Sequence, residues 1–381
     1  MILGARAPAC LEWARICSGA GWKVVVADSL CLPLSRKSQF VDRYIKLEEP
    51  KRHLRQWLDD IILAVSDLKI DIIIPTCEEV FYLSAVADRL SSYCRVFTSA
   101  FSLMHDLHHK GKFAESTRGC HIEAPETREI KSQQDLQSIT DESNEWVFKP
   151  AYSRFASRTR ITPSSSDMRD IFVNIQNPWI AQRYIQGKEI CSFSVLTKGI
   201  VRAHGCYHSP YRVGKGAGIF FQRLNSPEIF RFVEQFGLAT GYTGQVGFDF
   251  IQNQAGKLFV LECNPRATSG IHLFRSSGNA FLAALETENA MQVVEPSDDA
   301  MMVGAAMMIF GIVRYGNTSQ FWKDLWRGKD VVWDVGDLCP SMMQWIGLVE
   351  SCYRAVTRRC GLIAASTSDI EWDGDDLSKY L

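Results

Sequence analysis

The stretch FVLECNPRATSG, residues 259–270, places polar side chains where a buried strand would end. The apolar residues 258–261 run directly into Glu262, and Asn264 and Arg266 follow on either side of a proline. An unpaired carboxylate is costly to bury within an apolar strand. The pattern therefore predicts that these polar side chains meet a partner and do chemical work at the strand end.

That partner is expected in the segment just before. Residues 244–266 read as two antiparallel strands joined by a turn around NQAGK, 253–257. Such a hairpin would set Asp249 beside Glu262, and Asn264 would point the same way because strand side chains repeat with a period of two. Hard oxygen donors of this kind suit magnesium. The alternative is a surface hairpin with solvated acids.

The first hundred residues alternate short apolar strands with amphipathic helices, a pattern typical of a parallel sheet covered on both faces. The first strand leads into GARAPAC and not into G-x-G-x-x-G, which disfavours a dinucleotide site. We therefore predict a Rossmann-like open sheet without that fingerprint. The expected strands are 1–5, 22–28, 69–76 and 94–99, and the expected helices are 8–21, 53–68 and 78–93.

The rest of the chain mixes both element types. We expect helices at 102–119, 133–139, 165–175 and 227–241, strands at 124–130, 145–161 (interrupted by a loop), 179–185 and 187–208 (paired), and a loop at 209–224. The tail from 300 reads as mostly helical. Its apolar run, 301–313, is too short to span a bilayer and is predicted to be a buried core segment. The aromatic segment 315–334 is likewise expected to pack in the core more than to form a ligand site.

Composition excludes several classes of function. A length of 381 residues indicates two or three domains, and a formal net charge of −1 argues against nucleic-acid or membrane binding. The twelve cysteines contain no C-x-x-C and indicate reduced thiols in the cytoplasm. Arg6, Glu12 and Arg15 interrupt the layout of a signal peptide, which also favours a cytoplasmic location.

Four motifs, in order along the chain, carry a resemblance to a known family. HKGKF (109–113), WVFKPAYSRFASRTRI (146–161), IAQRYIQGKEICSFSV (180–195) and FDF…FVLECNPRATSGIH (248–272) are similar to the successive motifs of the ATP-grasp superfamily. The resemblance covers roughly 105–295, and the first hundred residues resemble the domain that usually precedes it.

The resemblance implies a fold that is α/β and α+β. A Rossmann-like N-terminal domain (1–104) would precede an ATP-grasp fold made of a small lid subdomain (105–188) and a larger antiparallel subdomain with the magnesium site (189–300). A helical C-terminal region (301–381) would follow.

The resemblance also assigns roles. Magnesium, with Mn²⁺ as a second metal that the same donors would take, is assigned to Asp249, Glu262 and Asn264. Arg266 and Lys149 become the catalytic residues, because they would stabilise the transferred phosphoryl charge. ATP contacts are assigned to Lys110, Lys149, Ser153, Ser157, Gln182, Tyr184, Ile185 and Glu189.

The sequence departs from the family pattern in the phosphate loop. Residues 151–159 contain no glycine, although backbone amides usually close over phosphate there. Ser153, Ser157, Arg154 and Arg158 would substitute side-chain donors.

Plainer interpretations stay open for several of these residues. Lys110 could be a solvated helix lysine, Glu189 an exposed strand acid, and Arg266 half of a structural salt bridge.

Histidines supply further candidates. His105, His108 and His109 have helical spacing that could hold a transition metal, against a solvated helix face as the alternative. His204, His208, Tyr211, Arg212 and Lys215 are expected to face the acceptor substrate and to bind its carboxylate, against a flexible basic loop as the alternative. His272, just after the arginine, is expected to contact one of the two substrates.

The expected activity is that of an ATP-dependent carboxylate–amine ligase that forms an acyl-phosphate and then an amide. Its partners would be a small carboxylate and an amine, amino acids among them, and a homodimer through the N-terminal half is implied by resemblance. The alternatives are an ATP-binding regulatory protein without ligase activity, and a bicarbonate-phosphorylating enzyme of the carboxylase or carbamoyl-phosphate-synthase type.

Overall fold

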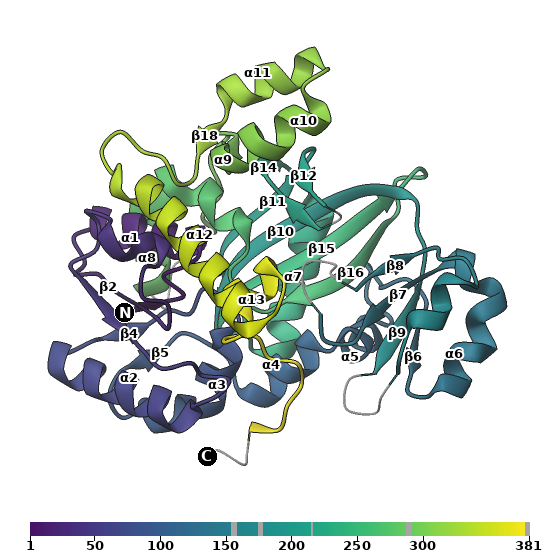
Figure 1. Cartoon of the computed structure of the whole chain (residues 1–381), viewed down its shortest axis with the longest axis horizontal. Helices are drawn as coiled ribbons and strands as arrows, with labels where there is room; N and C mark the ends of the chain where they lie inside the picture. The colour runs from purple at the N-terminus through teal and green to yellow at the C-terminus, as the bar shows by residue number, and fades with distance from the viewer. Residues whose placement is uncertain (154–157, 174–177, 215, 287–291, 378–381) are drawn as a thin grey trace.

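The structure is a computed structural model of the whole chain, and it describes residues 1–153, 158–173, 178–214, 216–286 and 292–377 (Figure 1). Two sheets, a four-stranded one and a seven-stranded one, lie beside an N-terminal α/β layer, and the C-terminal helices cross over that layer (Figure 1). Within the described residues, no helix is long and apolar enough to cross a membrane.

The N-terminal part is a parallel sheet, as predicted. Strands β1 (Ile2–Leu3), β2 (Val25–Asp28) and β3 (Arg43–Lys46) pair in that order, and β4 (Ile72–Ile73) pairs with β5 (Arg95–Val96). A bridge from Ile2 to Ile74 joins the two groups. Helices α1 (Pro8–Gly19), α2 (Leu54–Leu68) and α3 (Glu79–Leu90) cover the sheet.

The four-stranded sheet has the order β6-β9-β7-β8 and is antiparallel. Its strands are β6 (Thr127–Ile130), β7 (Trp146–Pro150), β8 (Arg160–Ile161) and β9 (Trp179–Arg183). Helix α6 (Gln133–Ile139) covers it and begins with a capping box, in which Ser132 and Asp135 satisfy each other's backbone N–H.

Two predicted helices in this region are wrong in extent. The helix expected at 102–119 is two helices, α4 (Phe101–His108) and α5 (Lys110–Ser116), because His109 is extended and its ring accepts the N–H of Lys112. The helix expected at 165–175 is a short 3-10 turn, η3 (Asp167–Asp170); residues 174–177 lie outside the described residues.

The seven-stranded sheet has the order β16-β15-β10-β11-β14-β17-β18. Helix α7 (Pro227–Thr240) packs against it, begins under the Ser226 cap and ends at Gly241, whose φ of 64° suits glycine. The 3-10 segment η4 (Ser269–Ser277) and helix α8 (Gly278–Glu286) follow the hairpin. The strands are β10 (Gly187–Thr197), β11 (Ile200–His208), β14 (Phe220–Leu224), β15 (Gly244–Asn253), β16 (Leu258–Asn264), β17 (Met301–Met302) and β18 (Lys329–Asp330).

The prediction of a loop at 209–224 is wrong. It contains the small hairpin β12 (Arg212–Val213) and β13 (Ala217–Gly218) and then β14.

The C-terminal region is mostly helical, but it also contributes β17 and β18 to the large sheet. The proposed domain boundaries at 104, 188 and 300 remain a proposal. The helical segments are α9 (Gly304–Ala306), the π-helical η5 (Met307–Gly311), α10 (Ile312–Tyr315), α11 (Ser319–Arg327), α12 (Cys339–Arg358) and α13 (Leu362–Thr367).

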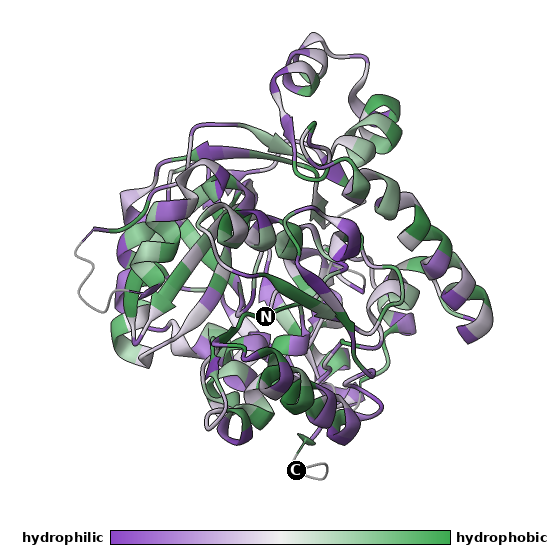
Figure 2. Cartoon of the chain, turned by 90° about the vertical axis from the view of Figure 1, so that its left-hand side faces the viewer, coloured by the Kyte–Doolittle hydropathy of each residue, from purple (hydrophilic) through white to green (hydrophobic). Residues whose placement is uncertain are grey.

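Hydrophobic residues, green in Figure 2, fill the strands and the inner sides of the helices. The prediction of a buried segment at 301–313 holds only for its first part: Met301 and Met302 are buried, whereas Phe310 and Val313 are exposed. The core-packing prediction for 315–334 is wrong for its tryptophans, since Trp326 is 94% exposed. Helices α10 and α11 project from the sheet (Figure 1); α11 buries only Phe321 and Asp324, and α10 buries no residue.

Candidate active site

The β15–β16 hairpin sets Asp249 directly opposite Glu262. Asn264 follows at the end of β16, and its amide nitrogen donates a hydrogen bond of 3.1 Å to Asp249 Oδ2. The structure thus brings together the three residues that the sequence predicted to converge. Two carboxylates and an amide oxygen at one sheet surface are a donor set of the kind that Mg²⁺ prefers.

Two buried lysines approach the same carboxylate from other elements. Lys110 begins α5 and Lys149 lies in β7, and their Nζ atoms are 3.5 and 3.7 Å from Glu262 Oε2. Lys110 also donates to the backbone oxygen of Ser153 at 2.7 Å. The interpretation of Lys110 as a solvated helix lysine is therefore wrong, because it is 5% exposed.

Burial and charge set opposite pKa shifts within this group. Burial and the adjacent Glu262 raise the pKa of Asp249. Burial by itself would raise the pKa of Glu262 as well, but the charges of Lys110 and Lys149 outweigh it and lower that pKa. Burial lowers the pKa of Lys149, although Glu262 partly opposes this shift. The site therefore holds Glu262 ionised and brings a second carboxyl close to it.

Gln182 lies in β9, at the contact between the small sheet and the large one. It is 2% exposed, and its amide nitrogen donates to Thr127 Oγ1 at 3.1 Å and to the backbone oxygen of Leu261 at 3.5 Å. The amide oxygen is then the part of Gln182 that can accept from an adenine amino group. The N–H of Tyr184 donates to the backbone oxygen of Glu145, so a purine edge would meet the carbonyl of Tyr184 or the backbone of Ile185.

Glu189 lies near the start of β10 and forms an ion pair with Arg212 of β12, 2.5 Å away. Its side chain is 51% exposed, which agrees with an exposed strand acid and also leaves it accessible to a ligand. The structure places Arg212 beside the acid assigned to ribose and not among residues assigned to the second substrate.

The phosphate loop is described only in part. Ser153 donates from Oγ to the backbone oxygen of Pro150 at 3.3 Å. Ser157 and Arg154 lie outside the described residues.

Arg266 follows Pro265, which ends the strand because proline cannot donate to the ladder. Its guanidinium donates to Asn264 Oδ1 at 3.3 Å and to the backbone oxygen of Ala267 at 3.1 Å. Glu78 Oε1 is 3.9 Å from its Nε, so the salt bridge that would make Arg266 purely structural is a long one. The amide of Asn264 thus contacts both Asp249 and Arg266.

A family model described as an ATP-grasp domain matches residues 108–270. This match identifies an ATP-grasp domain within residues 108–270 of the chain. No curated protein sequence matches the chain.

Three solved structures show how far the ATP-grasp fold is shared. An N5-carboxyaminoimidazole synthetase from Staphylococcus aureus, complexed with ADP, superposes with a TM-score of 0.62 at 13% identity, over 81% of this chain and 83% of that one. A biotin carboxylase from Campylobacter jejuni gives 0.60 at 14%, over 76% and 72%. An L-amino acid ligase from Bacillus licheniformis gives 0.55 at 14%, over 71% and 67%. At these identities the likeness shows the fold alone.

The predicted histidine cluster does not form among the described residues. His204 lies in β11 opposite Ser194, on the face of the sheet away from Asp249, and its ring bonds to the Ser194 hydroxyl at 2.9 Å. Burial lowers the pKa of His204 to about 4, so it is neutral at pH 7. His208 ends the same strand, Tyr211 is buried with its hydroxyl on Asp324, and Lys215 lies outside the described residues.

His272 has a structural partner. Its Nδ1 is 2.7 Å from Glu12 Oε2, and Glu12 also binds Arg275, so α1 is fastened to η4. His272 nevertheless reaches the wall of a cavity that Arg266 also lines.

The histidines before Lys110 are packed and not solvated. His108 and His109 are buried, and His105 Nε2 is 2.8 Å from the hydroxyl of Tyr152. Across the described parts of the chain, no three histidine, cysteine or carboxylate side chains gather as a metal site. The transition-metal interpretation therefore has no support.

Sequence reasoning missed the cavity itself. It measures about 480 Å³ and lies between the start of α1, the segment after β4, residues 266–272 and helices α12 and α13. No single motif spans these segments, so only the folded chain brings them together. The one signal in the sequence was the position of Arg266 just past the strand end.

Proposed function

We propose that the chain is an ATP-dependent ligase that phosphorylates a substrate carboxylate and then joins the acyl group to an amine. The observation that carries this proposal is the meeting of two buried lysines, Lys110 and Lys149, with Glu262, beside Asp249 and Asn264. Two cations with a carboxylate pair are what a nucleoside triphosphate and its divalent metal require, because phosphoryl transfer depends mainly on positioning and charge neutralisation.

The donor chemistry fits magnesium. Asp249, Glu262 and Asn264 offer hard oxygens, and three protein donors leave the remaining positions to phosphate and water, as Mg²⁺ usually requires. When bound, the ion would neutralise charge on the ATP phosphates; Mn²⁺ would take the same donors. Burial and the close approach of Glu262 raise the pKa of Asp249, and two carboxylates this close also suit a site that receives a cation.

The chain's own residues would share the remaining work. Lys110 and Lys149 would hold the phosphates as compact cations. Gln182 and the backbone near Ile185 would receive the adenine, and Glu189 would accept from the ribose hydroxyls. Arg266 would lie against the reacting carboxylate and the charge that develops on it.

The reaction would run in two balanced steps. A carboxylate oxygen attacks the γ-phosphorus of ATP. The bond between the γ-phosphorus and the oxygen that bridges it to the β-phosphate breaks, and ADP leaves. The amine nitrogen then attacks the acyl carbon, the carbon–oxygen bond to phosphate breaks, and the amine proton is released with inorganic phosphate.

A phosphate-release screen over pairs of carboxylic acids and amines, with the full chain and Mg·ATP, tests the proposal. We expect release that needs both partners, and a carboxylate labelled with ¹⁸O should pass one labelled oxygen to the phosphate. Nucleotide binding without release for every pair would favour a regulatory ATP-binding protein. Release with bicarbonate in place of the acid would favour a carboxylating enzyme, and a stable phosphorylated product without amine would indicate a kinase.

A further inference from the structure

The cavity beside Arg266 is large for the smallest acids. Its volume of about 480 Å³ lies in the ordinary range for small-molecule sites, roughly 300–1,000 Å³. A water molecule takes about 30 Å³ of liquid volume, so an ion as small as bicarbonate would leave most of the space empty. The volume of the cavity therefore suits a molecule considerably larger than bicarbonate.

The walls of the cavity are mainly apolar. Leu34 comes from the N-terminal part, Val332 follows β18, and Met343 and Leu348 come from α12. Met343 is 6% exposed, so its side chain faces inward. Apolar walls stabilise a ligand in proportion to the apolar area that it buries.

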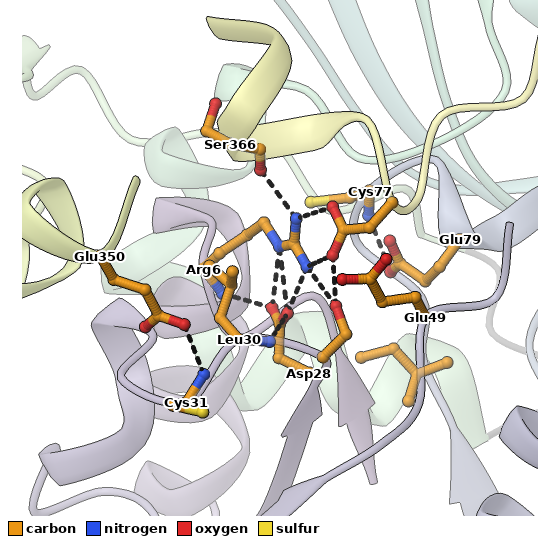
Figure 3. Close-up of polar contacts among 12 residues, drawn as sticks. Arg6, Asp28, Leu30, Cys31, Glu49, Cys77, Glu79, Glu350 and Ser366 are labelled. Carbon is orange, nitrogen blue, oxygen red and sulfur yellow. Dashed lines mark hydrogen bonds and ion pairs between the residues drawn. The ribbon is translucent and has the colours of Figure 1, made fainter. Parts of the chain in front are cut away.

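Two basic side chains on the wall are already held at short distance by carboxylates. The Arg6 guanidinium lies between Asp28 and the backbone of Ser366 in Figure 3, and it also binds Asp369 at 2.7 Å. His272 is held by Glu12 at 2.7 Å.

Arg266 differs from these two lining residues. Its one carboxylate partner in the described contacts is Glu78, a buried acid that also lines the cavity and forms only a long ion pair, 3.9 Å from Nε; the other partners of Arg266 are a neutral amide and a backbone oxygen. A guanidinium carries five N–H donors in a fixed fork that matches a carboxylate. Arg266 is therefore the most weakly paired of these basic side chains, and a ligand carboxylate that binds its fork more closely than Glu78 does would find it at the end of the cavity nearest Asn264.

We propose that this cavity binds the carboxylic acid substrate, and that this acid is a monoanion with an apolar body. The carboxylate would lie on Arg266 and the body between Leu34 and α12. A substrate with a phosphate group does not fit, because a dianion would need a second available cation. This inference rests on the proposed function and narrows it to a substrate class.

Helix α12 offers both a test position and a matched control. Met343 and Ser351 line the cavity, whereas Val349 lies on the outer face of the same helix and is 69% exposed. Substitutions at 343 or 351 change the space available to the ligand, and Val349→Ala removes a similar apolar side chain without touching the cavity.

The first experiment measures dissociation constants by calorimetry for acetate, butanoate, hexanoate and octanoate, with a non-hydrolysable ATP analogue present and absent. We expect the affinity to rise about fourfold for each added methylene group, until the chain fills the cavity. Hexanol should bind much more weakly than hexanoate, and Arg266→Gln should remove that difference. Equal affinities for acetate and octanoate would overturn the inference.

The second experiment changes the size of the cavity by substituting residues that line it. Met343→Ala should shift the preferred acid to a longer chain, Ser351→Leu should shift it to a shorter one, and Val349→Ala should leave it unchanged. Two opposite shifts keep the test informative if one variant fails to fold, which circular dichroism would reveal. An unchanged chain-length preference in a folded variant would overturn the proposed site.

The failure of this inference and the failure of the ligase proposal are distinguishable. Phosphate release that depends on an acid and an amine, but ignores substitutions at 343 and 351, would leave the ligase standing and reject the cavity as its acid site. Chain-length-dependent binding without phosphate release would support the cavity and reject the ligase.

Discussion

Asp249 and Glu262 face each other across the β15–β16 hairpin, although thirteen positions separate them in the sequence. Each carboxylate alone would be costly to bury. The pair is tolerable because Lys110 and Lys149 approach Glu262 within 3.7 Å and because Asn264 donates to Asp249. The hairpin thus concentrates negative charge at one point and surrounds it with donors.

Glu262→Gln should abolish turnover while the protein stays folded. Glutamine has nearly the same volume, and the loss of the Glu262 charge removes the largest effect, after burial, that raises the pKa of Asp249, so a carboxylate remains beside Lys149. We expect phosphate release to fall on the order of 100-fold or more, since a metal and phosphate ligand is lost. Phosphate release and circular dichroism are the measurements. Glu115→Gln, on an exposed glutamate of α5, is the control and should change neither. Full activity in folded Glu262→Gln would remove this carboxylate from the site.

Arg6→Met should destabilise the chain by about 3–5 kcal/mol, because it leaves the buried carboxylate of Asp28 without its cation and leaves Asp369 with only the more distant Arg354, 3.4 Å away. Asp28 and Asp369 both bind Arg6 and are almost completely buried; Figure 3 shows the contact between Arg6 and Asp28. Burial alone would raise the pKa of Asp369, but the Arg6 charge and hydrogen bond lower it, so the carboxylate is ionised in the folded protein. Urea denaturation measures the loss. Adding Asp369→Asn to Arg6→Met should recover part of it, whereas simple additivity of the two losses would show that the residues do not interact.

How much could be predicted from sequence depends on how local the signal was. The hairpin was predictable because its alternating pattern and its turn both fix the register of Asp249 and Glu262. Strand β3 was missed because its sequence, RYIK, has a charged residue at each end and only two apolar residues between them, both partly exposed. Such a short, partly charged segment is typical of an edge strand and gives little indication of a strand in the sequence. The break at His109 depends on a ring nitrogen that accepts a backbone N–H, and no propensity encodes that contact.

Long-range packing explains the remaining errors. His204 appeared to belong with Arg212 because the two are close in sequence, but β11 turns His204 to the far face of the sheet. The apolar run 301–313 was read as core, yet hydrophobicity does not say whether neighbouring elements will cover a helix. The cavity beside Arg266 draws on segments from Arg6 to Glu371, and its existence is a property of the fold alone.

Arg212→Gln should tighten ATP binding by up to about fivefold. Arg212 pairs with Glu189, whose side chain is 51% exposed, and solvent-accessible pairs are worth about 0.2–1 kcal/mol. If Glu189 accepts from the ribose hydroxyls, the nucleotide must displace Arg212 first, so removing the arginine lowers that cost. Calorimetric titration measures the dissociation constants of ATP and of 2′,3′-dideoxy-ATP, and only ATP should bind more tightly to the variant. Arg231→Gln, on the exposed side of α7, serves as the control. Weaker binding of both nucleotides would instead place Arg212 in contact with the phosphates.

His204 should make the folded state sensitive to acid. Burial lowers the pKa of His204 from 6.5 to about 4, so between these values the unfolded chain binds a proton that the folded chain does not. Stability from this residue is therefore complete above pH 6.5 and is lost as the pH falls toward 4, by up to about 3 kcal/mol at 1.36 kcal/mol for each pKa unit. Urea denaturation at pH 7 and pH 4.5 measures the difference. His204→Gln cannot take up the proton and should show a smaller loss between the two pH values, whereas His121→Gln, on an exposed histidine, should match the unsubstituted protein. The same pH dependence in His204→Gln as in the unsubstituted protein would mean that the ring is protonated within the fold, and the neutral, buried state of His204 would then be wrong.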